Sequence, residues 1–227
     1  MNKYRQSFIG DTLSDPYMVE DMRVDYRDGG RIEIPDKNKP LQVLLNWIEE
    51  ARRNELIEAN AMCISTIGKN GYPKSRMVLI KHINDFEIGF FTNLDSDKAN
   101  EINEDGRVSG VIFWPKLERQ VRITGRAVLI NRDAVLKYHL SRPRSSQIAA
   151  YTSSQSRPLE SLEHLLKEFE ETENRFQNKD IPLPKHWGGY VINIESVEYW
   201  SGRPSRLHER VKLELIDKRW FERRLYP

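Results

Sequence analysis

The sequence predicts an α+β domain with a mainly β core, an antiparallel barrel or sheet flanked by helices. Strand-like segments dominate the middle and the end of the chain, and helical segments lie between them. The pair Asn70-Gly71 separates two β-rich runs, which is a strong hairpin signal. Strands and helices do not alternate regularly, so a doubly wound parallel sheet is not expected.

The N-terminal part of the chain has no clear periodicity. We therefore expect a flexible arm over residues 1–21 and a single domain over residues 22–227. At the start of this domain, residues 22–30 predict a short helix or turn that ends at Gly29-Gly30. A helix follows Pro40, because apolar residues recur there with helical spacing, namely Leu41, Leu44, Leu45, Ile48 and Ala51.

The remaining elements are predicted in order along the chain. Runs rich in β-branched and aromatic residues predict strands at 62–67, 73–83, 88–92, 108–114, 119–130, 190–194, 197–200, 211–216 and 220–225. Helices are predicted at 96–104 with Ser96 as N-cap, at 132–151 with a break at Pro143, and at 159–176. The last helix is amphipathic, with an apolar side formed by Leu159, Leu162, Leu165, Leu166, Phe169 and Phe176.

Composition excludes several classes of function. The 227 residues carry 36 Lys+Arg and 34 Asp+Glu, a net charge of +2 that argues against a non-specific polyanion binder. The single cysteine, Cys63, excludes an intrachain disulfide and a cysteine-rich zinc or iron–sulfur site. No two histidines have metal-ligand spacing, so no metal is expected. The chain also lacks a signal peptide and a long apolar span, so we expect a cytosolic (cytoplasmic) protein.

Three familiar catalytic and nucleotide-binding motifs are absent. No G-x-G-x-x-G follows a predicted strand, no G-x-x-x-x-G-K-[ST] loop occurs, and no G-x-S-x-G elbow is present. A Rossmann dinucleotide site, a P-loop and an α/β-hydrolase nucleophile are therefore unsupported.

Cations lie where strands and turns would present them. Alternation places Arg76 and Lys81 on opposite faces of one strand, and Lys98 follows a predicted helix start where backbone N–H groups can meet a phosphate. Arg142 and Arg144 lie among serines, and guanidiniums with hydroxyls suit a phosphate monoester. The ordinary alternatives are solvent-facing strand ends, a simple N-cap and a surface loop.

The most unusual stretch runs from Val197 to Arg210. If this stretch is extended, Arg206, His208 and Arg210 point to one side of it. Three potential cations on one strand face repel each other, so an anionic partner is expected there.

The segment from Val197 to Arg210 resembles the signature of the pyridoxine/pyridoxamine 5′-phosphate oxidases, FMN enzymes that make pyridoxal 5′-phosphate. Similar segments follow the family's order, and the resemblance extends over roughly residues 22–227. It implies an FMN-binding split β-barrel and a homodimer with two FMN sites at the interface, each built from both subunits. The C-terminal segment would serve substrate binding and dimerisation. The other matching segments are RMVLIKH (76–82), FFTNLDSDKA (90–99), FWPKLERQVRITG (113–125), YHLSRPRSSQIAAYTSSQS (138–156), PLPKHWGG (182–189) and the closing RRLYP.

The resemblance implies a role for individual residues. Arg206 would orient the substrate and stabilise developing charge, and His208 would be a positioning hydrogen-bond partner, both over the pyridine ring as the catalytic pair. Arg23 and Tyr26 would close over the substrate as a lid. The substrate phosphate would be held by Lys81, Tyr138, Arg142 and Ser146. The FMN site would comprise Arg76, Met77, Val78, Leu79, Ile80, Lys81, Phe91, Thr92, Lys98, Gln120, Gln155, Ser156, Trp200 and Arg210.

The implied reaction serves vitamin B6 biosynthesis and salvage. A hydride passes from C4′ of the substrate to flavin N5, and O2 reoxidises the flavin with release of hydrogen peroxide. Pyridoxine 5′-phosphate gives the aldehyde directly, whereas pyridoxamine 5′-phosphate gives an imine that water hydrolyses to the aldehyde and ammonia. Substrate and FMN each bring a phosphate, so cations must gather locally even though the net charge of the chain is only +2.

The sequence departs from the family pattern in a few places. Asp97 stands where the family usually has a second cation before Lys98, and we expect it to face solvent or to pair with a neighbouring cation. Ser201 replaces the residue more usual after the tail tryptophan, and Val24 replaces a polar residue of the lid. Neither of these two changes threatens the implied chemistry.

Two other functions are alternatives to the oxidase. A protein on the same barrel could hold a flavin or a vitamin B6 phosphate without turnover, but it would not need Arg206 to Arg210 together with Tyr138 and Arg142. A nucleic-acid binder could use the basic tail, but acidic residues interrupt that tail, so it forms no continuous basic stripe.

Overall fold

The computed structural model describes residues 25–227, so the predicted arm over residues 1–21 lies outside the described residues. The chain over 25–34 forms no helix. Asp28 Oδ1 accepts a hydrogen bond of 2.8 Å from the Gly30 N–H, and Gly30 has a φ of +84° that a side chain would disfavour. Of the predicted helix or turn ending at Gly29-Gly30, the structure therefore has the turn.

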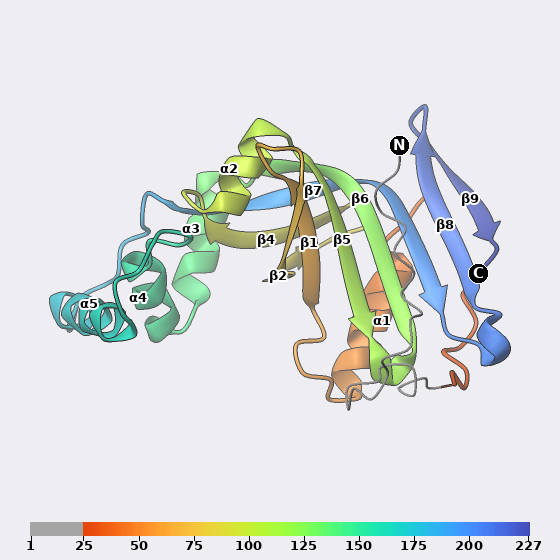
Figure 1. Cartoon of the computed structure of the whole chain (residues 1–227), viewed down its shortest axis with the longest axis horizontal. Coiled ribbons are helices and arrows are strands. Elements are labelled where there is room, and N and C mark those ends of the chain that lie inside the picture. The colour runs from red at the N-terminus through yellow and green to blue at the C-terminus, as the bar shows by residue number, and fades with distance from the viewer. Residues whose placement is uncertain (1–24) are drawn as a thin grey trace, which may run out of the picture.

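One antiparallel sheet forms the body of the molecule (Figure 1). Its strand order is β2-β1-β5-β6-β7-β4-β3, and β8 and β9 extend it from the second half of β7. β2 and β4 also lie close together, so the sheet curls into a barrel, which confirms the predicted fold class. The strands are β1 (Ala61–Ile67), β2 (Pro73–Leu79), β3 (His82–Ile83), β4 (Glu87–Asn93), β5 (Arg107–Trp114), β6 (Arg119–Leu129), β7 (Trp187–Ser201), β8 (Glu209–Ile216) and β9 (Arg219–Leu225).

Helices flank the barrel as predicted. α3, α4 and α5 gather beyond one end of the sheet, and α1 packs against its inner face (Figure 1). Pro143 separates α3 from α4, as its fixed φ and missing N–H require. No helix in the described part of the chain is long and apolar enough to cross a membrane. The helices are α1 (Gln42–Arg53), α2 (Asp97–Glu104), α3 (Arg132–Ser141), α4 (Arg144–Thr152) and α5 (Leu162–Arg175).

Two predicted strand boundaries differ from the structure. The strand predicted at 73–83 is broken, because Ile80 N–H bonds Asn60 O whereas Lys81 N–H bonds Gly89 O on β4. The strands predicted at 190–194 and 197–200 are one strand, β7, in which Glu195 is an extra residue opposite the Thr124–Gly125 step of β6. A β-bulge at Glu195 therefore lets the strand continue where the prediction divided it.

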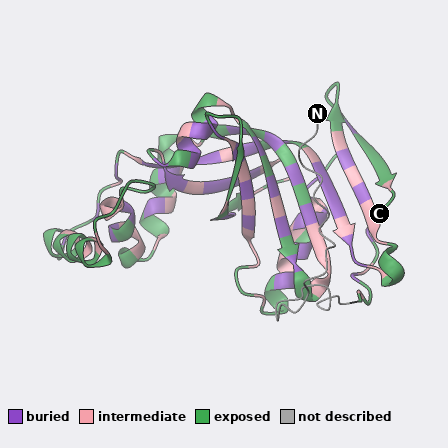
Figure 2. Ribbon diagram, viewed as in Figure 1, coloured by how far each residue is buried: buried purple, intermediate pink, exposed green. Residues whose placement is uncertain are grey.

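The core lies between α1 and the inner face of the sheet. Strand residues alternate between buried and exposed (Figure 2). Leu44 and Trp47 of α1 are buried, and the Trp47 ring meets Trp114 and Tyr199 edge-on at 6.4 and 5.4 Å. The Tyr199 hydroxyl donates to Pro40 O at 2.6 Å. Burial of each large side chain contributes about 1.5–3 kcal/mol, so this helix is firmly attached to the sheet.

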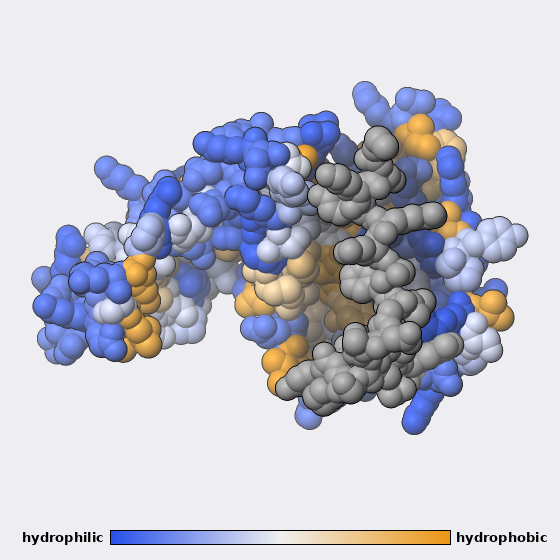
Figure 3. Space-filling model, viewed as in Figure 1, coloured by the Kyte–Doolittle hydropathy of each residue, from blue (hydrophilic) through white to orange (hydrophobic). Residues whose placement is uncertain are grey.

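The apolar side predicted for the last helix is only partly packed. Leu159, Leu162 and Leu166 are 50%, 62% and 60% exposed, whereas Phe176 is buried against Tyr151. Figure 3 shows apolar residues at the surface over this end of the molecule. The predicted amphipathic helix is therefore present, from Leu162 to Arg175, and half of its apolar side is exposed in a single chain.

Candidate functional site

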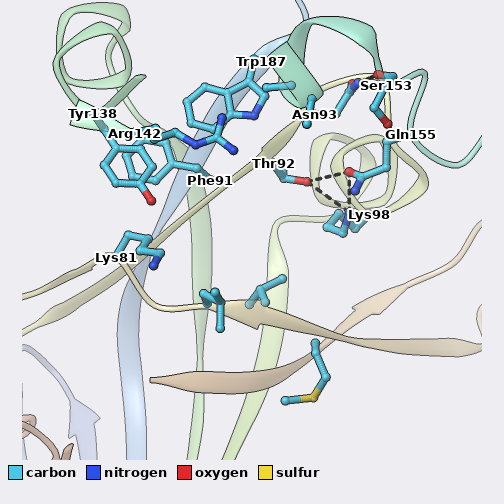
Figure 4. Close-up of a pocket in the computed structure, with 15 residues that line it drawn as sticks. Lys81, Phe91, Thr92, Asn93, Lys98, Tyr138, Arg142, Ser153, Gln155 and Trp187 are labelled. Atoms are coloured by element: carbon cyan, nitrogen blue, oxygen red, sulfur yellow. Dashed lines mark hydrogen bonds between the residues drawn. The ribbon is translucent and has the colours of Figure 1, made fainter. Parts of the chain in front are cut away.

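Ten residues singled out from the sequence line one cavity of about 360 Å³. The cavity lies between β2 and β4 on one side and helices α2 to α4 on the other (Figure 4). A second cavity shares Lys81, Phe91 and Tyr138 with it. The predicted residues in the first cavity are Met77, Val78, Leu79, Lys81, Phe91, Thr92, Lys98, Tyr138, Arg142 and Gln155, and the residues not predicted are Asn93, Ala149, Ala150, Ser153 and Trp187.

The break after β2 positions one wall of this cavity. Strand alternation turns Met77 and Leu79 to the outer face of the sheet, and the crossing from β1 to β4 then carries Lys81 to the cavity beside Phe91. Ile80 is buried in the barrel core and does not line the cavity. The Ile80 side chain therefore does not reach the cavity, and only its backbone, which sets the direction of Leu79 and Lys81, can contribute to the predicted flavin site.

Lys98 of α2 is a buried cation with only neutral neighbours in hydrogen-bond reach. Its Nζ donates to Thr92 Oγ1 at 3.1 Å, to Gln155 Oε1 at 3.0 Å and to Ser96 Oγ at 3.4 Å. Among the described residues, no carboxylate lies within 4.0 Å of this nitrogen. Burial, assisted by the charge of Arg76, lowers the pKa of Lys98. A buried ammonium without a counter-ion is costly, so an anion in this cavity would stabilise it.

Arg76 lies at the border of the cavity and is already held by protein groups. Its Nη2 is 2.8 Å from Glu101 Oε2, and its Nη1 donates to Thr66 Oγ1 and to Lys74 O. Burial raises the pKa of Glu101, but hydrogen bonds from Thr66, Lys74 and Arg76 outweigh burial and lower it. Glu101 is thus an ionised, buried anchor for Arg76, and sequence reasoning missed it.

Arg142, at the end of α3, also lacks an anionic partner within residues 25–227. Its guanidinium is half-buried and its Nη1 is fully buried without a hydrogen bond. Burial lowers the pKa of Arg142. The guanidinium carbon lies 4.6 Å from the centre of the Trp187 ring, which sequence reasoning did not place in the site although the matching segment PLPKHWGG contains it. Figure 4 shows Arg142 and Lys98 on different sides of the cavity.

Three further predicted positions lie around this cavity. Asp97 is the first residue of α2 and is exposed, with no ion pair in the part of the chain that the structure describes. The expectation that it faces solvent is therefore confirmed. Ser146 on α4 and Ser156, which has a φ of +68°, do not line the cavity, although Gln155 beside Ser156 does.

The other predicted residues form a second group at the far end of β6 and β7. Gln120, Trp200 and Arg210 are directly opposite one another on β6, β7 and β8. The buried Glu198 holds Arg210, with its Oε1 2.9 Å from both Nε and Nη2 of the guanidinium. The Tyr26 ring meets Trp200 edge-on at 5.3 Å.

Arg206 and His208 lie next to this row, but not on a strand. The expected extended face of Arg206, His208 and Arg210 is wrong, because Pro204–Arg206 forms a 3-10 turn and β8 begins only at Glu209. Ser205 and Arg206 have φ of +56° and +60°, a conformation that stores backbone strain in residues with a side chain.

His208 is fixed by its neighbours. Its Nδ1 accepts the Arg203 N–H at 3.2 Å, which leaves the proton of the neutral ring on Nε2. The ring also meets Tyr26 at 5.0 Å. Burial, and then the charge of Arg206, lower the pKa of His208. The proposed lid residue Arg23 lies outside the described residues.

The two groups do not meet within one chain. Met77 of the first group and Glu198 of the second lie in one lateral row of the sheet, which runs through Cys63, Val111 and Arg122. Four steps between neighbouring strands span about 19 Å. Met77 is 62% exposed on the face between them, so this face carries apolar surface as well as both groups.

Comparison with known proteins gives consistent matches over nearly the whole chain. Residues 48–176 match the family model described as pyridoxamine 5′-phosphate oxidase, and residues 187–227 match the one described as pyridoxine 5′-phosphate oxidase C-terminal dimerisation region. A pyridoxine/pyridoxamine 5′-phosphate oxidase of Synechocystis sp. is 38% identical over 94% of this chain and 100% of its own length. Its counterpart in Proteus mirabilis is 39% identical over 92% of this chain and 96% of its own length.

Solved structures match in the same way. PhzG from Burkholderia lata, in complex with tetrahydrophenazine-1-carboxylic acid, has a TM-score of 0.81 and 25% identity, covering 88% of this chain and all of that chain. A pyridoxamine 5′-phosphate oxidase-related, FMN-binding protein from Nostoc punctiforme has a TM-score of 0.69 at 16% identity, covering 83% of this chain and 97% of that chain. The second of these likenesses concerns the fold alone.

Proposed function

Because this chain belongs to the pyridoxine/pyridoxamine 5′-phosphate oxidase family, we propose that its two groups of site residues bind FMN and a phosphorylated B6 vitamer for oxidation by O2. The enzyme oxidises pyridoxine 5′-phosphate or pyridoxamine 5′-phosphate to pyridoxal 5′-phosphate in vitamin B6 metabolism. The observation that carries the assignment of the pocket is that one cavity holds two cations without counter-ions among the described residues, the buried Lys98 and the half-buried Arg142.

The donor set of the cavity fits a flavin phosphate at its α2 side. Lys98, Thr92 and Gln155 form one hydrogen-bonded cluster beside the start of α2, and Arg76 stands next to it. A phosphate there would give Lys98 the counter-ion that the protein does not supply. Met77, Val78, Leu79, Lys81 and Phe91 would line the rest of the flavin, with Ile80 directing the chain and Ser156 next to Gln155.

The donor set at the α3 side fits the phosphate of the substrate. Arg142 and Tyr138 lie one helical turn apart, Lys81 faces them across the cavity, and Ser146 follows in the first turn of α4. The bound flavin would supply the two-electron oxidation, with O2 as final acceptor. In this scheme Arg142 and Lys81 orient the phosphate end, which holds C4′ in a fixed position.

A homodimer would unite the two groups. The dimerisation region matched over residues 187–227 contains Trp200 and Arg210. Trp200 lies at the opposite end of β7 from Trp187, which lines the cavity, and Arg210 is opposite Trp200 on β8. Both groups border one sheet face with exposed apolar side chains, Met77 and Phe113. A second copy on this face would bring Gln120, Trp200 and Arg210 of one subunit to the cavity of the other, so that each flavin site contains both chains.

Arg206 and His208 would then reach the substrate from the second copy. The 3-10 turn presents the Arg206 guanidinium to solvent, where it can approach the pyridine ring and stabilise developing negative charge. His208 keeps Nε2–H available as a donor because its Nδ1 is engaged by Arg203. Tyr26 packs on His208, and with Arg23 it would close the site.

The proposal is tested first on the wild-type protein. The purified protein should show a flavin absorption spectrum, and pyridoxamine 5′-phosphate in air should give peroxide and pyridoxal 5′-phosphate in equal amounts. A yellow protein without turnover would instead support the alternative of a binding protein, and a colourless protein that binds no added FMN would contradict both.

A second experiment tests the shared site. Lys98→Met and Arg210→Ala each weaken one group, so the assay uses an FMN concentration that loads only intact sites. Co-expressed chains then form mixed dimers with one intact site, and about a quarter of wild-type activity should return. Co-expression of Lys98→Met with Arg142→Leu is the matched control, because both changes fall in the same group and no mixed dimer has an intact site. Equal activity in the two mixtures would refute the shared site.

A further inference from the structure

Three aromatic rings form a nearly parallel stack beside the cavity. The Phe91 ring lies 4.0 Å from Tyr138 at an interplanar angle of 15° and 5.4 Å from Trp187 at 3°. Arg142 continues the stack, because its guanidinium carbon lies 4.6 Å from the Trp187 ring centre (Figure 4). The proposed phosphate-binding arginine therefore rests on the flat face of an indole.

Trp187 is the most firmly fixed member of this stack. Its side chain is buried, and it begins β7 opposite Asn93 of β4. Its N–H donates to Pro184 O at 3.2 Å, and its carbonyl accepts from Arg132 Nη1 at 2.5 Å. The backbone on both sides of the indole is therefore tied down, and the ring offers Arg142 a rigid surface.

Stacking holds an arginine in a way that an acidic partner cannot. An arginine stacked on an aromatic face keeps all five N–H donors of its plane free, whereas a carboxylate occupies two of them and cancels the charge. In the same protein Arg76 is held by Glu101 and Arg210 by Glu198, but Arg142 has no carboxylate within 4.0 Å in the described residues. Its buried Nη1 has no hydrogen bond to any residue that the structure describes.

We propose that Trp187 is a positioning residue for substrate phosphate: the indole holds the Arg142 guanidinium in place, with its donors free and its charge uncancelled. This inference rests on the proposed function of the cavity. The residue acts on binding of the phosphorylated vitamer and not on the oxidation step, because the cation that it contacts, Arg142, is the one proposed to hold the phosphate end of the substrate.

The test compares Trp187→Leu and Trp187→Phe in the holoenzyme. A cation–π contact at a partly desolvated site is worth about 1–2 kcal/mol, so Trp187→Leu should raise KM for pyridoxine 5′-phosphate roughly 10-fold with kcat within about 2-fold. Phenylalanine keeps an aromatic face, so Trp187→Phe should recover most of the loss. The inhibition constant of inorganic phosphate, a probe without a pyridine ring, should rise with KM in the leucine variant.

Two controls separate positioning from general packing. Trp114→Leu removes an equally buried indole from the main core, and it should lower the melting temperature without changing KM. In an Arg142→Leu background, Trp187→Leu should add no further rise in the phosphate inhibition constant, because the group that it positions is absent.

The possible results are distinct. An unchanged KM and phosphate inhibition constant in a folded, flavin-loaded Trp187→Leu enzyme would overturn the inference, as would an additive effect in the Arg142→Leu background. If the leucine variant does not fold, KM and the phosphate inhibition constant are measured on the phenylalanine variant instead. Both values should then lie slightly above those of the wild type, and unchanged values would overturn the inference. A wild-type protein that oxidises neither vitamer would refute the proposed function instead, and calorimetric titration of pyridoxal 5′-phosphate into the Trp187 variants would still decide whether Trp187 supports phosphate binding.

Discussion

Replacement of Lys98 by methionine should separate flavin affinity from the stability of the flavin-free protein. Lys98 is 8% exposed, and its ammonium has three neutral acceptors and no carboxylate within 4.0 Å among the described residues. Without a flavin phosphate the charge is buried at a cost, and with the phosphate it makes a charge-assisted contact. The two states of the enzyme should therefore respond in opposite ways to Lys98→Met.

The size of each effect follows from these contacts. A charge-assisted hydrogen bond contributes about 1.5–3 kcal/mol, so the dissociation constant of FMN should rise roughly 10- to 100-fold. In the flavin-free protein, Thr92 Oγ1 still donates to Gln155 Oε1 at 3.0 Å after the replacement. Neither Thr92 nor Gln155 is therefore left without a hydrogen bond. The free energy of unfolding of this form should change by no more than about 1 kcal/mol, or increase, because the buried charge is gone.

Denaturant unfolding of the flavin-free proteins and fluorescence titration with FMN measure the two quantities. The exposed Lys74→Met is the matched control and should change FMN binding by less than Lys98→Met, since its Nζ contacts Glu101 at the border of the site. A loss of more than about 2 kcal/mol in the flavin-free Lys98→Met protein, or an unchanged FMN dissociation constant, would refute the reasoning.

The pH dependence gives an independent check on the same variant. Burial lowers the pKa of Lys98 below the 10.5 of an ordinary lysine, so between these two values the unfolded chain binds more protons than the folded one. The stability of the wild-type flavin-free protein therefore rises through this window, relative to Lys98→Met. The free energy of unfolding of flavin-free Lys98→Met should therefore exceed that of wild type by less as the pH approaches 10.5. A difference that grows with pH would contradict the burial of a charged Lys98.

Three further predictions follow from the site and the sheet. Arg206→Ala should lower kcat/KM by about 100-fold while FMN stays bound, as steady-state kinetics and the flavin spectrum will show, and near-normal turnover would rule out its role. Asp97→Arg should tighten FMN binding, because it replaces an exposed negative charge beside Lys98 by a positive one, and an unchanged dissociation constant would count against this. Gly125→Ala should destabilise the fold by about 1–3 kcal/mol in thermal unfolding, since an added Cβ would overlap Asn193 O at the bulge, and a stability equal to wild type would show that the bulge can shift.

Local patterns in the sequence were enough to predict most of the fold. The α1 helix follows from apolar residues at helical spacing, the α3–α4 break from Pro143, and the first hairpin from Asn70-Gly71. The errors occur where a long-range partner decides the local structure. The break at Lys81 arises because its N–H bonds Gly89 on β4, and the single strand β7 persists because β6 accepts a bulge at Glu195.

The resemblance predicted ten of the residues that line the cavity, but it did not predict the groups that hold the cations in place. Glu101, Glu198 and Trp187 are far in sequence from the arginines they hold, and no spacing rule connects them. The turn at Ser205 and Arg206 was also missed, because an alternating Arg-x-His-x-Arg pattern is compatible with a strand, and only the left-handed backbone of the folded chain shows otherwise.

The way in which each site cation is held indicates what that cation can do. Arg76 and Arg210 are paired with buried carboxylates, so each is fixed in place but brings little net charge to a ligand. Lys98 and Arg142 are held by neutral groups, so each brings an uncancelled charge to the cavity. A ligand phosphate gains most beside the second pair. The chain's net charge of +2 conceals this difference, which arises only from the partners that folding supplies.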